Sequence, residues 1–301
     1  MPEFPARRHA VAGAPGAAER PTPPWTGSAP TDPAVPAIEC VGLTRRFADR
    51  VAVSGVSFQV NSGELFGLLG PNGAGKTTTH RMLTTVLAPT AGTARVAGFD
   101  VVSEAQRVRY HIGVVFQDPA LDDRLTAAEN LDLHAVVYRV RRRWIAPLVR
   151  EALEWAELSD RADSLVRTFS GGMKRRLELA RALLHQSRVL FLDEPTVGLD
   201  PQGRRRLWDR ITAMRERGLT IFLTTHNMQE AEACDRVAII DRGRLLVIGT
   251  PAGLRVQVTG RADATLEDVF LELTGHGLRD EEATSRDQLL SFARRGGELT
   301  R

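Results

Sequence analysis

Gly70-Pro-Asn-Gly-Ala-Gly-Lys-Thr77 follows a short apolar run, Leu65–Leu69, and precedes a helix-like segment. The segment fits the phosphate-binding pattern G-x-x-x-x-G-K-[ST], in the strand-to-helix context that this pattern requires. Its glycines let the backbone curl so that several N–H groups face phosphate oxygens, and the N-terminus of the next helix adds a positive dipole. The residues expected to hold the phosphates are Gly70, Pro71, Asn72, Gly73, Ala74, Gly75, Lys76, Thr77 and Thr78.

Two carboxylates narrow the chemistry of this site. The apolar run Val189–Leu192 ends in Asp193 and Glu194. We expect Asp193, at the tip of a strand, and the Thr77 hydroxyl to hold Mg²⁺, and Glu194 to polarise the attacking water as a general base. The phosphate loop alone fits a kinase, a GTPase, a helicase or a transporter ATPase. A GTPase also needs an Asn-Lys-x-Asp motif to bind its base, and the sequence has none.

Short apolar runs recur from Ile38 onward, each bounded by Gly, Pro, Asn, Asp or charged residues. Continuous runs of this kind are typical of strands that are buried on both faces, and helix-like stretches separate them, so we predict an α/β sheet. The runs are Val56–Val60, Leu65–Leu69, Ile112–Val115, Val189–Leu192, Thr220–Leu223 and Val237–Ile240.

The segment from about residue 118 to residue 185 has few strand signals. Thr126-Ala-Ala-Glu129 is a capping box, in which the hydroxyl and the carboxylate satisfy the first N–H groups of a helix. A further helix is predicted over Trp144–Leu158. We therefore predict a helical insertion within a domain that spans residues 38–250.

The two ends of the chain differ from this domain. The first 37 residues contain nine of the sixteen prolines and no hydrophobic periodicity, which predicts a disordered extension rich in Pro and Ala. Residues 251–301 are predicted to form an appendage. It contains one helix at about residues 265–274, where apolar residues recur at helical spacing between a Thr265 cap and a Gly275 stop.

Composition limits the possible functions. The 301 residues are 43% hydrophobic, which is enough for a core, and no apolar run approaches the roughly 20 residues that cross a bilayer. We also expect no signal peptide. The net charge of +3 is too small to indicate a nucleic-acid partner, and two separated cysteines predict neither a disulfide nor a metal site. Lys76 and Lys174 are the only lysines, so the lysine of the phosphate loop is conspicuous.

Phe169-Ser-Gly-Gly-Met-Lys-Arg-Arg176 is similar to the Leu-Ser-Gly-Gly-Gln signature of the ATP-binding cassette (ABC) family, and it precedes Asp193 at the family's spacing. The resemblance covers about residues 38–249 and implies an α/β fold, the P-loop NTPase fold of an ABC nucleotide-binding domain with a helical subdomain. Ser170, Gly171 and Gly172 begin a helix and so form a second anion site. In the family, two cassettes dimerise head-to-tail, and each signature closes over the partner's nucleotide.

Four further residues match family positions. Gln117 matches the glutamine that contacts Mg²⁺, water and the membrane partner, and His226 matches the histidine that contacts the γ-phosphate. Asp200 matches the loop aspartate at the dimer interface, and Phe47 matches the aromatic residue that stacks on adenine. Met173 departs from the pattern, because it replaces the signature glutamine and cannot form that amide's hydrogen bonds.

Two segments resemble the daunorubicin-resistance branch of ABC exporters: Met173–Arg176 after Ser-Gly-Gly, and Thr265–Gly275. The resemblance implies an ATPase subunit that uses ATP and Mg²⁺ and forms an ATP-dependent homodimer. It would energise export of a hydrophobic drug, an antibiotic or a lipid-like substrate through a separate integral membrane permease. The subunit would then be peripheral to the cell membrane, on its cytoplasmic side.

Two alternatives remain open from the sequence. A non-transport ABC ATPase would act on nucleic acid or ribosomes, but such proteins usually carry two cassettes, a long coiled coil or zinc-binding cysteines. An import cassette would carry a different C-terminal extension.

Overall fold

The computed structural model describes residues 35–185 and 187–275. Almost all of the predicted N-terminal extension, and residues 276–301 of the predicted appendage, lie outside the described residues. The strands are β1 (Ile38–Phe47), β2 (Arg50–Val60), β3 (Leu65–Leu69), β4 (Ala91–Val96), β5 (Phe99–Asp100), β6 (Ile112–Val115), β7 (Val189–Asp193), β8 (Thr220–Thr225), β9 (Arg236–Asp241) and β10 (Arg244–Gly249).

The helices are α1 (Lys76–Leu83), α2 (Ala105–His111), α3 (Ala127–Val137), α4 (Arg142–Trp155), α5 (Gly171–Leu183), α6 (Pro201–Glu216), α7 (Met228–Glu232), α8 (Pro251–Leu254) and α9 (Leu266–Thr274). Short turns of other helix types lie at η1 (Ser159–Arg161), η2 (Val166–Thr168) and η3 (Arg255–Thr259). None of these helices within the described ranges has both the length and the apolar character that crossing a bilayer requires.

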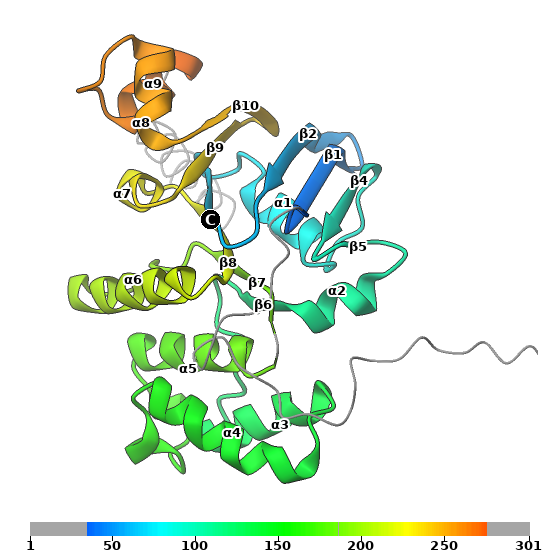
Figure 1. The fold of residues 1–301 in the computed structure, drawn as a ribbon, viewed down its shortest axis with the longest axis vertical. Coiled ribbons are helices and arrows are strands. Elements are labelled where there is room, and N and C mark those ends of the chain that lie inside the picture. Colours follow the sequence, from blue (N-terminus) through cyan, green and yellow to red (C-terminus); the bar gives the residue numbers. More distant parts are fainter. Residues whose placement is uncertain (1–34, 186, 276–301) are drawn as a thin grey trace, which may run out of the picture.

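Two sheets form the centre of the described structure (Figure 1). In the six-stranded sheet the order is β10-β9-β3-β8-β7-β6, and all neighbours are parallel except β10, which pairs antiparallel with β9. The four-stranded sheet is antiparallel, with the order β2-β1-β4-β5. The α/β architecture was predicted, but the separate antiparallel sheet was not.

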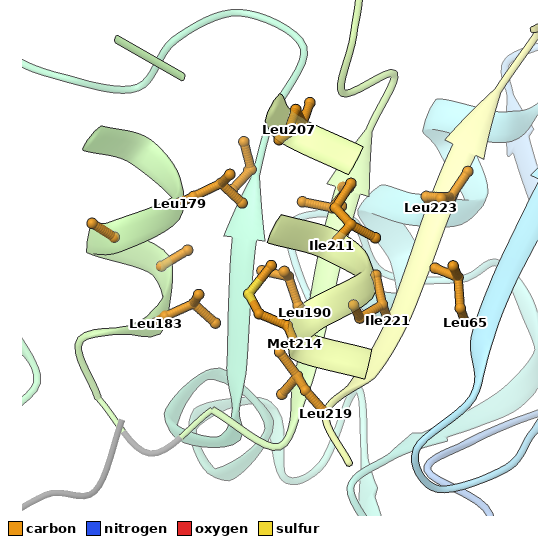
Figure 2. Close-up of a cluster of buried hydrophobic side chains, with 14 of the residues drawn as sticks. Leu65, Leu179, Leu183, Leu190, Leu207, Ile211, Met214, Leu219, Ile221 and Leu223 are labelled. Carbon is orange, nitrogen blue, oxygen red and sulfur yellow. The ribbon is translucent and has the colours of Figure 1, made fainter. Parts of the chain in front are cut away.

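Strand β3 shows why the parallel strands are apolar at every position. Leu65 and Leu69 face a core that includes α5 and α6, whereas Phe66 and Leu68 face a second core on the side of the four-stranded sheet. Figure 2 shows the first core, where leucines of α5 and α6 lie over the sheet. Since successive side chains of a strand point to opposite faces, a strand that is covered on both faces must be apolar throughout.

The run Val56–Val60 is different, and the prediction that it is buried on both faces was wrong. In β2, Val56, Phe58 and Val60 are buried, while Ser57 and Gln59 are exposed. The antiparallel sheet therefore has one solvated face, and the alternation of apolar and polar residues is the usual pattern of such a sheet.

Helices α3, α4 and α5 lie between β6 and β7 in the chain and pack into one core. The capping box is present, because Thr126 Oγ1 accepts the N–H of Glu129 and the Glu129 carboxylate accepts the N–H of Thr126. The helix predicted over residues 144–158 instead spans Arg142–Trp155. It ends early because Glu157 has a φ of 55°, which no α-helix accommodates.

Helix α9 lies where the apolar periodicity predicted a helix. Thr265 Oγ1 accepts the N–H of Asp268 at the start of α9, and Gly275 ends the helix with a φ of 73°. Leu266, Val269 and Phe270 are buried in the core that also contains α5 and α6. The C-terminal part of the described chain therefore packs onto the same core as α5 and α6.

Two histidines, the half-buried His134 and the buried His185, connect α3 to the segment after α5. His134 Nε2 lies 3.3 Å from His185 Nδ1, and His185 Nε2 lies 2.9 Å from the Ile112 carbonyl oxygen. The Tyr138 ring stacks on His185, with ring centroids 3.8 Å apart. Burial lowers the pKa of His185 to about 4 and the pKa of His134 to about 2. Both imidazoles are therefore neutral at pH 7.

We expect this burial to make stability pH-dependent. An unfolded histidine takes up a proton near pH 6.5, whereas the pKa of folded His185 is about 4. Between these values the unfolded state binds more protons, so the free energy of unfolding is highest above pH 6.5 and falls as the pH drops toward 4. His185→Gln should reduce this slope by up to about 1.4 kcal/mol per pH unit, and Tyr138→Phe should not. Urea unfolding at a series of pH values measures the slopes, and equal slopes for wild type and His185→Gln would contradict the expectation.

Candidate functional site

A cavity of about 940 Å³ opens where the loops after β3, β6, β7 and β8 meet. Ligands of open α/β sheets usually bind at this carboxyl edge of the strands. Of the residues predicted to form the site, those that line the cavity are Phe47, Asn72, Gly73, Gly75, Lys76, Thr77, Thr78, Gln117, Glu194 and His226. Gly70, Pro71, Ala74 and Asp193 are buried next to this lining.

The phosphate loop joins β3 to α1 and needs glycine at specific points. Gly73 and Gly75 have φ values of 82° and 105°, and Gly75 is the N-cap of α1. A Cβ atom on Gly75 would lie 2.7 Å from the Ala52 carbonyl oxygen. The positive φ and this close approach together explain why glycine occupies the position.

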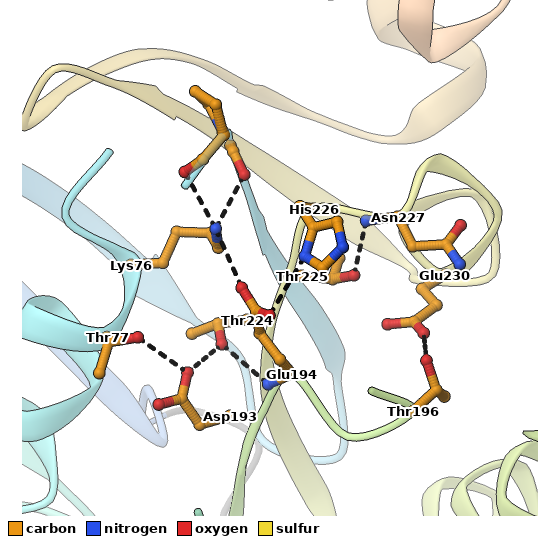
Figure 3. A network of polar contacts seen from close by, with 12 residues as sticks. Lys76, Thr77, Asp193, Glu194, Thr196, Thr224, Thr225, His226, Asn227 and Glu230 are labelled. Carbon is orange, nitrogen blue, oxygen red and sulfur yellow. Dashed lines mark hydrogen bonds and ion pairs between the residues drawn. The ribbon is translucent and has the colours of Figure 1, made fainter. Parts of the chain in front are cut away.

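Lys76 is the first residue of α1, and its side chain is 4% exposed. Its Nζ donates hydrogen bonds to the carbonyl oxygens of Gly70 (2.9 Å) and Pro71 (3.0 Å) and lies 3.2 Å from Glu194 Oε1 (Figure 3). The loop therefore holds a buried positive charge at the wall of the cavity.

Glu194 lies between two cationic or polar donors. Its Oε2 is 3.2 Å from His226 Nδ1, and its Oε1 faces Lys76. Burial acts to raise the pKa of Glu194, but the contacts with His226 and Lys76 outweigh burial, so this pKa is below its ordinary value. The carboxylate is therefore ionised at neutral pH and can accept a proton.

The backbone at Glu194 is also constrained. Its φ is 46°, and its N–H donates to the carbonyl oxygen (3.1 Å) and the hydroxyl (3.2 Å) of Thr224 on β8. A positive φ is uncommon for a residue with a side chain and is held here by the neighbouring strand. This conformation turns the chain at the end of β7.

Oxygen ligands for Mg²⁺ are present beside this carboxylate. Thr77 Oγ1 lies 3.4 Å from Asp193 Oδ1, which also accepts a hydrogen bond from the Thr224 hydroxyl, and exposed Gln117 lines the same cavity. Within the described residues no three His, Cys, Asp or Glu side chains are grouped to hold a metal ion. Mg²⁺ in phosphate-transfer sites is usually held by one or two protein oxygens, water and the substrate phosphates, so these residues fit it.

Phe47 is the last residue of β1 and precedes the phosphate loop in the sequence, whereas the two carboxylates follow the loop. Its side chain is 45% exposed although it is large and apolar, and the Arg45 guanidinium lies 4.7 Å from its ring centroid. An exposed ring beside the phosphate loop is suited to stack on a planar base.

The signature residues and Asp200 line a second cavity of about 290 Å³, not the first. Ser170 Oγ accepts the N–H of Met173 (3.3 Å) and caps α5, with Gly171 and Gly172 as the first residues of that helix. Asp200 Oδ1 accepts the N–H of Gly203 (2.6 Å) and caps α6. One chain therefore keeps the phosphate loop and the signature in separate cavities.

Several residues of the first cavity were not predicted from the sequence. Glu230 of α7 accepts a hydrogen bond from the Thr196 hydroxyl, and burial raises its pKa above the ordinary value. Its position only four residues after His226, at the start of a helix, is a signal that could have identified it. Arg50 and Arg204 also line the cavity, but they come from β2 and α6 and share no motif with the phosphate loop.

Comparisons of the sequence and of the fold with known proteins all point to ATP-binding proteins of ABC transporters. Residues 53–197 match the sequence model of the ABC transporter family. The Nod factor export ATP-binding protein I of Burkholderia lata is 44% identical over 85% of this chain and 81% of its own. The daunorubicin resistance ATP-binding protein DrrA3 of Streptomyces coeruleorubidus is 42% identical over 77% of this chain and 74% of its own. A solved ATP-binding subunit of an ABC transporter superposes with a TM-score of 0.72, at 30% identity, over 79% of this chain and 99% of that one.

Proposed function

Since the chain belongs to the ATP-binding subunits of ABC transporters, which hydrolyse ATP, we propose that it energises export of a hydrophobic drug, an antibiotic or a lipid-like substrate. The support comes from its relatives, because one is named for export of Nod factor and another for daunorubicin resistance. The substrate path lies in a separate integral membrane permease. The subunit is peripheral to the cell membrane and binds the permease from the cytoplasmic side.

The observation that carries the head-to-tail dimer within this proposal is the separation of the two cavities. Lys76 and Glu194 line the first, and Ser170 lines the second. A head-to-tail homodimer places the Ser170 cap and the N-terminus of α5 of one copy over the phosphate loop of the other, which adds an anion site to each nucleotide. Asp200 lies beside Ser170 in the second cavity and so belongs to the same interface.

Within the first cavity, the residues have distinct roles in ATP hydrolysis. The loop N–H groups and Lys76 bind the phosphates, and Phe47 stacks on adenine. Glu194 accepts the proton of the attacking water, while His226 orients its carboxylate. When bound, Mg²⁺ offsets phosphate charge, held by Thr77, Asp193 and Gln117.

We expect transport to be measurable with daunorubicin as the probe. Inside-out membrane vesicles are prepared from cells that produce this chain together with the membrane protein encoded beside it. ATP should drive daunorubicin into these vesicles, because the cytoplasmic side faces outward and the drug is moved away from it. Fluorescence of the drug reports its accumulation.

The matched control contains the same permease and the Glu194→Gln variant, which should assemble normally but turn over ATP much more slowly. Accumulation equal to that of the control would reject daunorubicin export. ATPase activity that instead rises with added nucleic acid or ribosomes would favour a non-transport ABC ATPase.

A further inference from the structure

Arg175 on α5 is a buried guanidinium with an unusual set of acceptors. Its Nε donates to the Pro195 carbonyl oxygen (2.9 Å), and its Nη1 donates to the Phe116 carbonyl oxygen (2.6 Å). Its Nη2 lies 3.4 Å from the Glu194 carbonyl oxygen and 3.5 Å from that of Asp193. A single side chain of the signature helix therefore contacts the backbone at the ends of both β6 and β7.

These acceptors flank two residues of the nucleotide site. Phe116 directly precedes Gln117, and the consecutive carbonyls of residues 193–195 surround Glu194. Since the Glu194 backbone has a positive φ, its direction depends on neighbouring contacts rather than on intrinsic preference. Arg175 supplies contacts on the carbonyl side of this turn, and Thr224 supplies contacts on the N–H side.

Two more side chains of α5 hold the segment after Gln117. Glu178 pairs with Arg175 (Nη1 to Oε2, 3.3 Å) and accepts the N–H of Ala120 (2.9 Å), and Arg181 donates to the Ala120 carbonyl oxygen. Residues at intervals of three lie on one face of a helix. One face of α5 therefore forms hydrogen bonds to the backbone on both sides of Gln117.

The same helix begins at the signature. Ser170 caps α5, and Arg175 follows after about one and a half turns, a rise of roughly 7.5 Å. A helix this short moves as a rigid rod, so a shift of its N-terminus also shifts Arg175. Stability alone is a weak reason for such a residue, because a buried ion pair adds little net stability compared with apolar packing.

We propose that Arg175 is a positioning residue that couples the signature of each subunit to Glu194 and Gln117 of the same subunit. When the signature binds the partner's nucleotide, α5 moves and Arg175 sets the backbone that aims Glu194 in its own site. This inference rests on the proposed head-to-tail dimer. It makes the two nucleotide sites interdependent through protein contacts within each chain.

The test compares Arg175→Met and Arg175→Lys with matched variants of Arg210. Arg210 is also mostly buried and also donates to a backbone carbonyl (Trp155) and a carboxylate (Glu157), but it lines neither the phosphate-loop cavity nor the signature cavity. The measurements are kcat for ATP, the Kd for a non-hydrolysable ATP analogue, the melting temperature, and ATP-dependent dimer formation by gel filtration.

We expect Arg175→Met to lower kcat about 100-fold and Arg175→Lys about 10-fold, because a lysine keeps the charge but cannot reach the separated carbonyls together. The Kd for the analogue and the ATP-dependent dimer should persist in both. Arg210→Met should change kcat less than about threefold. If Arg175→Met does not fold, the kcat of Arg175→Lys is compared with that of Arg210→Lys, and this comparison decides.

Wild-type kcat in a dimeric Arg175→Met variant would overturn the inference. Equal losses of kcat and melting temperature in the Arg175 and Arg210 variants would overturn it too, because they would show a structural role only. If the Glu194→Gln variant, which retains ATP, forms no ATP-dependent dimer, the proposed function fails instead, so the two failures are distinguishable.

Discussion

Glu194→Gln should lower ATP turnover by about 10²–10⁴-fold and leave ATP binding within a few-fold of wild type. Glutamine has nearly the same shape and can still contact His226 Nδ1, but an amide cannot accept the proton of the attacking water. Lys76 remains in place and gains freedom to bind phosphate, since its ion pair with Glu194 is lost. Steady-state phosphate release measures turnover, and calorimetric titration measures ATP affinity.

The arrested variant should accumulate as an ATP-held dimer, which gel filtration detects. Glu230→Gln is the matched control, because Glu230 is a buried carboxyl in the same cavity whose pKa is raised by burial. Glutamine keeps the shape of this side chain and an oxygen that can accept from the Thr196 hydroxyl, and we expect turnover to fall less than about tenfold. If Glu194→Gln kept wild-type turnover, another group would have to be the base.

The fold was predictable where local sequence and tertiary environment agree. Leu65–Leu69 and Ile112–Val115 match β3 and β6 because a parallel strand covered on both faces must be apolar throughout. Strands β1 and β4 were not predicted, since only alternate positions of the antiparallel sheet are buried and the apolar runs are interrupted. Their pairing depends on contacts between distant segments, which no local pattern contains.

The candidate site was also predictable only where its residues are contiguous in the sequence. The phosphate loop, Asp193 and Glu194 were located because each is part of a contiguous motif at the end of a strand. Arg175 was not singled out, although it lies within the quoted signature, because its acceptors lie in the segments that follow two distant strands, β6 and β7. Charge in a sequence indicates neither burial nor partners, so a buried arginine and a surface arginine look alike until the chain is folded.

Lys76→Ala should weaken ATP binding by at least about 100-fold, which corresponds to one or two charge-assisted hydrogen bonds of about 1.5–3 kcal/mol each. The loss has two parts. The phosphates lose a cation, and the Glu194 carboxylate, which now lies 3.2 Å from Lys76 Nζ, would face them without a neutralising charge. Turnover should fall with affinity, unlike in Glu194→Gln, where affinity persists.

The chain offers an unusually clean control, since Lys174 is its only other lysine. Lys174 Nζ pairs with Asp123 Oδ1 at 2.7 Å, and 56% of the Asp123 side chain is exposed, so the pair is worth little in water. Lys174→Ala should leave ATP affinity of the monomer within about threefold of wild type. Equal losses in both variants would mean that general positive charge, not the phosphate loop, binds ATP. The double variant Lys76→Ala/Glu194→Gln separates the two roles further. It should fail to form the ATP-held dimer, because the loss of Lys76 prevents ATP from binding even though the loss of Glu194 blocks its hydrolysis.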